Sequence, residues 1–212
     1  QKRANRRLKS HLEAESVDEA VHGYVPGRSI WTALSRHFGG ERLDAPLAWF
    51  GFDIANAFPS VSHRWVDRLL AEFFPSLSRP ARAAAVNLLC NRGYLNPGYP
   101  TSPVLFNLAL RPIDRELRTY CEPRDIVYTR YADDFTFSSP REFSAQERIE
   151  LQRIVSRLPY RFRIVKQEKG ALGDNFLVTH RSSERFRRRL RRDRARGVSR
   201  AESLQNLQAG RP

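Results

Sequence analysis

The order of elements along the chain predicts an α+β fold, with helices packed on one side of an antiparallel sheet. Three observations lead to this class. Residues 126–138 (IVYTRYADDFTFS) hold two β-rich arms around a tight turn, which indicates a hairpin. Residues 46–54 form a short apolar run typical of a buried strand. The other stretches have helical spacing, and 212 residues suffice for one domain with a core, or one domain and part of another.

The N-terminal stretch leads up to the first strand. Residues 1–22 are basic at their start and predict one or two helical pieces. The segment 22–30 (HGYVPGRSI) contains Gly and Pro and predicts a loop that continues into a helix over 31–38. The strand at 46–54 follows and holds Asp53 near its end.

Helical stretches separate that strand from the hairpin. Apolar residues at four-residue spacing predict a helix over 61–74, and an Ala-rich stretch predicts another over 80–90. Residues 96–103 contain three prolines and a glycine, so an ordered loop is expected there. A further helix over 104–120 then leads into the hairpin.

The C-terminal part begins with a capping box. The Ser-x-x-Glu pattern at Ser144 predicts a helix that extends to 158. Residues 160–165 and 171–178 alternate like two strands. The last predicted helix, 184–196, has eight arginines between 185 and 196.

The charge balance points to a polyanionic partner. The net charge is +14, which favours nucleic acid over a merely basic soluble protein. Two cysteines without a Cys-x-x-Cys pattern give no zinc site or disulfide framework, which indicates a reducing, cytoplasmic location. The sequence shows no membrane-spanning run and no signal peptide, so no membrane partner is expected. The absence of methionine and the start at Gln1 suggest a portion of a longer polypeptide.

Three carboxylates are the candidate catalytic residues. Asp133 and Asp134 repel each other on the hairpin turn, and a hard cation such as Mg²⁺ would compensate them. Asp53, near the end of a buried strand, would complete a site for two divalent ions of the kind used in phosphoryl transfer. The alternatives are a solvated acidic turn for the pair, and a helix cap or turn residue for Asp53.

Three segments resemble motifs A, B and C of reverse transcriptases, in the right order: GFDIANAFPSV (51–61), GYPTSPVLFNLAL (98–110) and YTRYADDFTFS (128–138). The resemblance implies that Asp53 and Asp133 bind two Mg²⁺ ions, for which Mn²⁺ can substitute. Asp134 and the backbone of Ile54 assist in this binding. It also implies that Phe58 is a steric gate against a ribose 2′-OH.

Further segments are similar to retron and group II intron enzymes. HGYVPGRSI (22–30) resembles the loop before motif A, and Pro-Thr-Ser-Pro at 100–103 resembles the retron form of motif B. Residues 166–170 (KQEKG) resemble motif D, which makes Lys169 a candidate general acid for the pyrophosphate leaving group; the alternative is a surface lysine. Three retron signatures are altered, including Val178-Thr179-His180 where retrons have Val-Thr-Gly.

The resemblance implies a right-hand polymerase fold with a ferredoxin-like antiparallel palm sheet. Residues 1–46 would be part of the fingers and residues 47–180 the palm, with a helical fingers insertion at about 62–95. Residues 181–212 would begin the thumb.

Other residues are candidate contacts. Ser102 would bond the nucleotide or cap its helix, capping being preferred. Arg28 would reach template phosphate or brace its loop. Asn107 would shape the motif-B helix, or be a surface or core amide. The basic helix would track backbone phosphates through Arg185, Arg188, Arg189 and Arg192.

The implied activity is RNA-directed DNA synthesis: extension of a DNA or RNA primer with dNTPs on an RNA template, in a bacterial retron-type or phage-defence enzyme. Implied partners are a structured non-coding RNA and an effector protein. Two alternatives stay open. One is template-independent or protein-primed synthesis by a defence-associated relative, and the other is a non-catalytic RNA-binding palm module.

Overall fold

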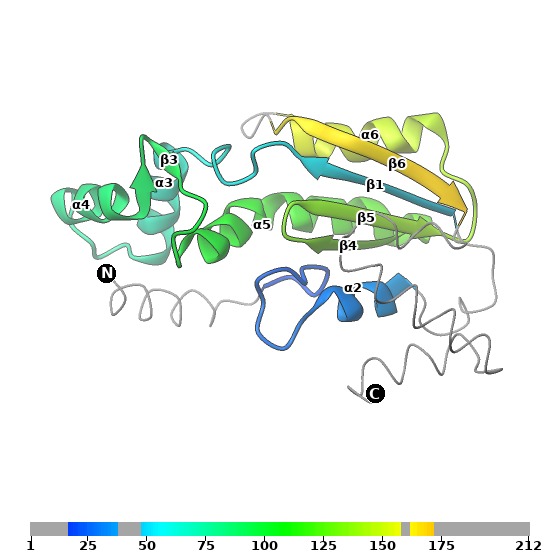
Figure 1. Cartoon of the computed structure of the whole chain (residues 1–212), viewed down its shortest axis with the longest axis horizontal. Helices are drawn as coiled ribbons and strands as arrows, with labels where there is room; N and C mark the ends of the chain where they lie inside the picture. The colour runs from blue at the N-terminus through cyan, green and yellow to red at the C-terminus, as the bar shows by residue number, and fades with distance from the viewer. Residues whose placement is uncertain (1–16, 38–47, 158–161, 172–212) are drawn as a thin grey trace.

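A four-stranded antiparallel sheet forms the centre of the computed structural model, which describes residues 17–37, 48–157 and 162–171 (Figure 1). Its strands are β1 (Ala48–Ile54), β4 (Val127–Tyr131), β5 (Asp134–Ser139) and β6 (Ile164–Ala171). They lie in the order β4-β5-β1-β6, and every neighbouring pair is antiparallel. With one helical connection before β4 and another before β6, this is the ferredoxin-like arrangement that the resemblance implies.

Two helices cover one face of the sheet. They are α5 (Ser102–Cys121) and α6 (Ala145–Ser156), and the capping box predicted at Ser144 is present. Between them and the sheet lies a cluster of stacked and tilted aromatic rings that includes Phe52, Phe135 and Tyr128. Alternation along the strands places these rings on the same side, so the predicted aromatic strands supply the core.

The opposite face is covered near β4 by α2 (Ile30–His37) (Figure 1). The sequence predicts helices on one side of the sheet only, so α2 is an addition to the predicted arrangement. His37 is fully buried there. Its Nδ1 lies 2.7 Å from the Ser138 hydroxyl, and its Nε2 lies 2.7 Å from the Thr129 hydroxyl. Small polar residues on this face of β4 and β5 therefore replace apolar packing with hydrogen bonds.

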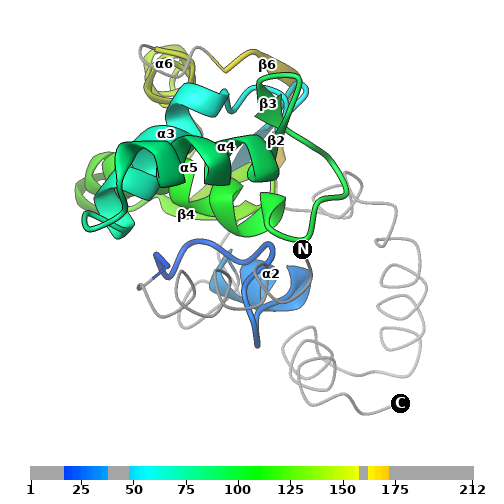
Figure 2. The same cartoon turned by 90° about the vertical axis from the view of Figure 1, so that its left-hand side faces the viewer.

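A second group of elements lies between β1 and α5 in the sequence, at one end of the molecule (Figures 1 and 2). It consists of α3 (His63–Phe73), α4 (Arg79–Leu89) and a small hairpin of β2 (Cys90–Asn91) and β3 (Tyr94–Leu95). The sequence predicts a fingers insertion for this stretch, and that assignment stays a prediction. A 3₁₀ turn, Glu122–Arg124, follows α5.

The strand prediction after α6 is wrong in its boundaries. One strand, β6, runs through the charged residues at 166–170, where a break between two strands was expected. β6 lies at the sheet edge, where polar side chains are tolerated on a strand. The rest of the predicted strand 171–178 and the basic helix at 184–196 lie outside the described residues. No helix in the described ranges is long and apolar enough to cross a membrane.

Candidate active site

The turn between β4 and β5 has an unusual backbone. Tyr131 pairs with Asp134, so Ala132 and Asp133 alone form the turn. Ala132 has φ of 59°, a left-handed conformation that costs a non-glycine residue about 1 kcal/mol. Such a conformation persists where the surrounding structure holds it in place. We call residues 132–133, which include the predicted catalytic residue Asp133, the catalytic turn below.

The structure brings the three predicted acids to the same end of two neighbouring strands. Asp53 pairs directly with Asp134 across β1 and β5, which places their Cα atoms about 5 Å apart. The backbone N–H of Ile54 donates to the carbonyl of Asp133 at 3.1 Å. All three acidic side chains are partly exposed, so they remain accessible to a ligand.

The acids fit a metal ion that is shared with a ligand. Within the described ranges, no group of three or more His, Cys, Asp or Glu side chains forms a ready metal cage. Mg²⁺ is commonly bound by one or two carboxylates together with substrate phosphates and water. The paired ends of β1 and β5 supply carboxylate oxygens of this kind, so the residues present fit the predicted ion.

Phe58 lies beside two other aromatic rings. Its ring centroid is 5.2 Å from that of Phe106 on α5 and 6.0 Å from that of Tyr24. Phe58 is half-buried, whereas Tyr24 is 45% exposed. The ring at the predicted gate position is therefore held from one side by the core helix α5.

Tyr24 is a candidate that the sequence reasoning missed. It has φ of 61°, and its pKa is raised by burial and by the nearby charge of Asp133. Strained backbone conformations cluster at functional sites, and Tyr24 lies near the predicted acid Asp133. The signal in the sequence that could have identified Tyr24 is its position in the HGYVPGRSI loop.

The segment before Tyr24 packs directly on the catalytic turn. The N–H of His22 donates to the carbonyl of Arg130 at 2.8 Å, and the N–H of Arg130 donates to the carbonyl of Ala20 at 2.8 Å. A Cβ added at Gly23 would lie 2.1 Å from the backbone nitrogen of Ala132. Only glycine allows this approach without displacing the backbone.

Arg28 braces its own loop. Its Nη1 donates to the carbonyl of Asp18 at 2.6 Å and to that of Val21 at 2.5 Å. Of the two roles expected for Arg28, the described contacts support bracing.

Ser102 does not cap its helix, so the preferred role is wrong. The residue at the cap position is Thr101, and Ser102 is the first residue of α5. The buried Ser102 hydroxyl donates instead to the carbonyl of Asn96 at 2.7 Å. This hydrogen bond ties the proline-containing loop to the start of α5.

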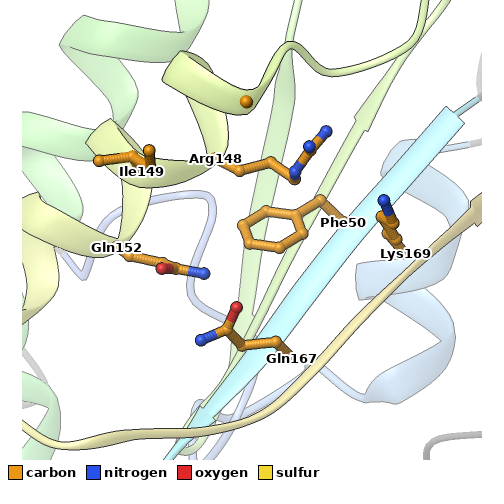
Figure 3. A pocket seen from close by; sticks show the side chains of 7 residues that line it. Phe50, Arg148, Ile149, Gln152, Gln167 and Lys169 are labelled. Carbon is orange, nitrogen blue, oxygen red and sulfur yellow. The ribbon is translucent and has the colours of Figure 1, made fainter.

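Lys169 is placed away from the acids. It pairs with Phe50, three residues before Asp53 on β1, which is about 10 Å along the strand. It lines a cavity of about 330 Å³ between β6 and α6, together with Arg148, Gln152 and other residues (Figure 3). The structure therefore does not bring Lys169 to the acidic cluster. Arg185, Arg188, Arg189 and Arg192 lie outside the described residues.

Comparison with known sequences gives a family. The model of the family described as reverse transcriptase (RNA-dependent DNA polymerase) matches residues 1–173. The chain is 34% identical over 152 residues to the Retron Mx65 reverse transcriptase of Myxococcus xanthus, covering 63% of this chain and 33% of that protein. It is 42% identical over 144 residues to the Retron Ec83 reverse transcriptase of Escherichia coli, covering 62% of this chain and 42% of that protein. The chain thus spans less than half the length of these curated relatives.

Comparison with solved structures supports the fold. The apo telomerase of Candida tropicalis, truncated from its C-terminal domain, has a TM-score of 0.55 and 10% identity over 79% of this chain and 40% of that one. Telomerase of Candida albicans in complex with a TWJ fragment of telomeric RNA has a TM-score of 0.53 and 12% identity, over 80% and 35% of the two chains. At such identity the likeness shows the fold alone, the α+β right-hand polymerase fold. With the family match over most of its length, the chain belongs to the reverse transcriptase (RNA-dependent DNA polymerase) family, as a retron-like member.

Proposed function

We propose that this chain is the central part of an RNA-directed DNA polymerase, which extends a primer 3′-OH with dNTPs on an RNA template. The observation that supports this most is the direct pairing of Asp53 with Asp134 beside the catalytic turn. Partly exposed acids at adjacent strand ends suit the binding of a phosphate substrate through metal ions. The retron relatives support the same activity.

In this proposal Asp53 and Asp133 hold two Mg²⁺ ions, with Asp134 and the backbone of Ile54 assisting. When bound, the two ions activate the attacking oxygen and stabilise the leaving oxygen of the phosphoryl transfer. Mn²⁺ would substitute, because its oxygen ligands are the same. The protein contributes fixed positions for the carboxylates, since Asp53 and Asp134 lie on paired strands and Asp133 lies in the turn that joins β4 to β5.

Phe58 is proposed to select deoxyribonucleotides. Its ring is held against Phe106 of α5, so it is not free to move aside for a 2′-OH. A rigid ring excludes the added hydroxyl and offers it no hydrogen-bond partner. Tyr24, on the other side of Phe58, is proposed to border the same nucleotide site.

The partners are proposed from the relatives and from the charge. A net charge of +14 suits an RNA template with a DNA or RNA primer, and the arginines at 185–196 would contact their phosphates. A cognate structured RNA and an effector protein are proposed because the curated relatives are retron enzymes.

Primer extension on a defined RNA template tests the proposal. The full native chain would be given Mg²⁺ and four dNTPs, and the product would be sequenced, beside the isosteric variants Asp133→Asn and Asp125→Asn. Asp125 is the matched control, because it lies at the other end of β4 with φ of 54°, a conformation that asparagine adopts readily. Complementary DNA is expected from wild type and Asp125→Asn, and none from Asp133→Asn.

Two other outcomes would change the conclusion. Non-complementary DNA would indicate template-independent synthesis. No DNA from the wild type, together with tight RNA binding that Asp133→Asn leaves intact, would indicate a non-catalytic RNA-binding module.

A further inference from the structure

A completely buried arginine lies three residues before Asp133. Arg130 is on β4 and has no exposed surface, and its partner Asp114 on α5 is 1% exposed. The guanidinium donates through Nε to Asp114 Oδ1 at 2.8 Å and through Nη2 to Asp114 Oδ2 at 2.7 Å. The hydroxyl of Tyr128 also donates to Asp114 Oδ1, at 2.7 Å. This side of the guanidinium forms a two-bond ion pair with α5.

The remaining nitrogen of Arg130 reaches the catalytic turn. Nη1 donates to the carbonyl of Ala132 at 2.7 Å and to Asn107 Oδ1 at 3.0 Å. Asn107 is also buried, and its Nδ2 donates to the carbonyl of Gly23 at 2.9 Å, so it links Arg130 to Gly23. One side chain therefore joins α5, the catalytic turn and the 20–23 segment.

Stability alone does not account for this arrangement. Buried ion pairs are often no more stabilising than apolar residues of similar size, because both charges lose their hydration. The contact with the carbonyl of Ala132 has a more specific consequence. It holds the residue with φ of 59° whose carbonyl carbon is bonded directly to the nitrogen of Asp133. A planar group with several donors in a fixed fork is needed to make these four bonds together, and among the side chains only arginine has one.

We propose that Arg130, supported by Asp114 and Asn107, is a positioning residue that fixes the catalytic turn so that the Asp133 carboxylate meets its metal ion in one geometry. The inference rests on the proposed function only in that Asp133 binds a divalent ion. Asn107 is thereby assigned a role that its sequence context left open: it links Arg130 to the 20–23 segment.

Binding of Mn²⁺ to the full native chain, followed by electron paramagnetic resonance without nucleic acid, tests the inference. Asp133→Asn defines the part of the binding that belongs to this site. Arg130→Lys keeps the charge opposite Asp114 but loses the fork that reaches Ala132 and Asn107. We expect it to weaken Mn²⁺ binding at the site about tenfold, the usual effect of removing a group that orients a metal ligand.

Thr129→Val is the matched control. Thr129 is the neighbouring residue on β4, points to the opposite face and bonds His37 at 2.7 Å, so its loss removes a buried hydrogen bond that does not lead to the catalytic turn. We expect Thr129→Val to lower the midpoint of urea unfolding and to leave the Mn²⁺ affinity unchanged. Asn107→Ala serves as the second variant, because it leaves the ion pair with Asp114 in place; it is expected to weaken Mn²⁺ binding in the same direction as Arg130→Lys.

Two results would overturn the inference: unchanged Mn²⁺ affinity in both Arg130→Lys and Asn107→Ala, or an equal loss of affinity in Thr129→Val. Primer extension by the same proteins separates this from the proposed function. If the wild type makes no DNA, and Arg130→Lys binds Mn²⁺ more weakly than the wild type, the polymerase proposal is refuted and the positioning role is supported.

Discussion

Gly23→Ala is expected to disable the enzyme while leaving it folded. The added Cβ would lie 2.1 Å from the nitrogen of Ala132 and 2.9 Å from its Cα, both of them backbone atoms. To reach the 3.4 Å of an ordinary contact, the two backbones must separate by at least 1.3 Å. The 20–23 segment cannot simply move away, because the carbonyl of Gly23 is held by Asn107 and the N–H of His22 by Arg130. The displacement therefore falls partly on the catalytic turn.

A misplacement of about 1 Å in a catalytic group costs about 100-fold in rate, and we expect a loss of this size for Gly23→Ala. Single-turnover primer extension at saturating dNTP measures it. Gly27→Ala, in the same loop, is the control: its Cβ would meet nothing within 4 Å, and its φ of 74° costs alanine only about 1 kcal/mol. Equal rates in the two variants, with both folded by circular dichroism, would show that the contact of Gly23 with the turn does not position the acids.

Three further predictions concern other parts of the fold. Phe58→Ala is expected to raise ribonucleotide use relative to deoxyribonucleotide use by at least about tenfold in competitive primer extension, because the excluding ring is lost; an unchanged ratio would argue against a gate. His37→Ala leaves two buried hydroxyl groups without their hydrogen bonds, and is expected to lower the free energy of unfolding in urea by about 2 kcal/mol; no change would mean that water replaces the ring. The hydrogen bond from Arg141 lowers the pKa of Glu147 from 4.5 to about 2, so the stabilisation by Glu147 is complete above pH 4.5 and is lost as the pH falls towards 2. The stability of Glu147→Gln is therefore expected to vary less with pH over this range, and parallel profiles would contradict the assignment.

The sequence predicts the hairpin and the first helical turn of α6 well, for local reasons. The hairpin at 126–138 has strong alternation and β-branched and aromatic residues. Its turn contains Asp133, whereas Asp134, which was predicted on the turn as well, is the first residue of β5. The capping box forms as expected, because its two members, Ser144 and Glu147, are only three positions apart in the sequence. The pairing of Asp53 with Asp134 required the family resemblance, since nothing near Asp53 in the sequence indicates which strand lies beside it.

Long-range contacts explain what the sequence did not show. In the sequence, Arg130 looks like an ordinary polar residue of an alternating strand. Its burial depends on Asp114, 16 residues earlier on α5. Lys169 matches a motif by type, but the register of β6 on β1 places it opposite Phe50. Residues 166–170 lie between the two predicted strands, at 160–165 and 171–178, and are part of the single strand β6 in the structure. A sheet edge tolerates such charged residues.

The position of the catalytic turn follows from support on two sides. On one side, the N–H of Ile54 on β1 donates to the carbonyl of Asp133. On the other side, the 20–23 segment pairs with Arg130 and packs Gly23 against Ala132. A hairpin turn alone would be free to move, since loop ends have few contacts of their own. Here residues more than 70 positions away hold both sides of the turn. Substitutions at Gly23 should therefore affect metal binding as strongly as changes much closer to Asp133 in the sequence.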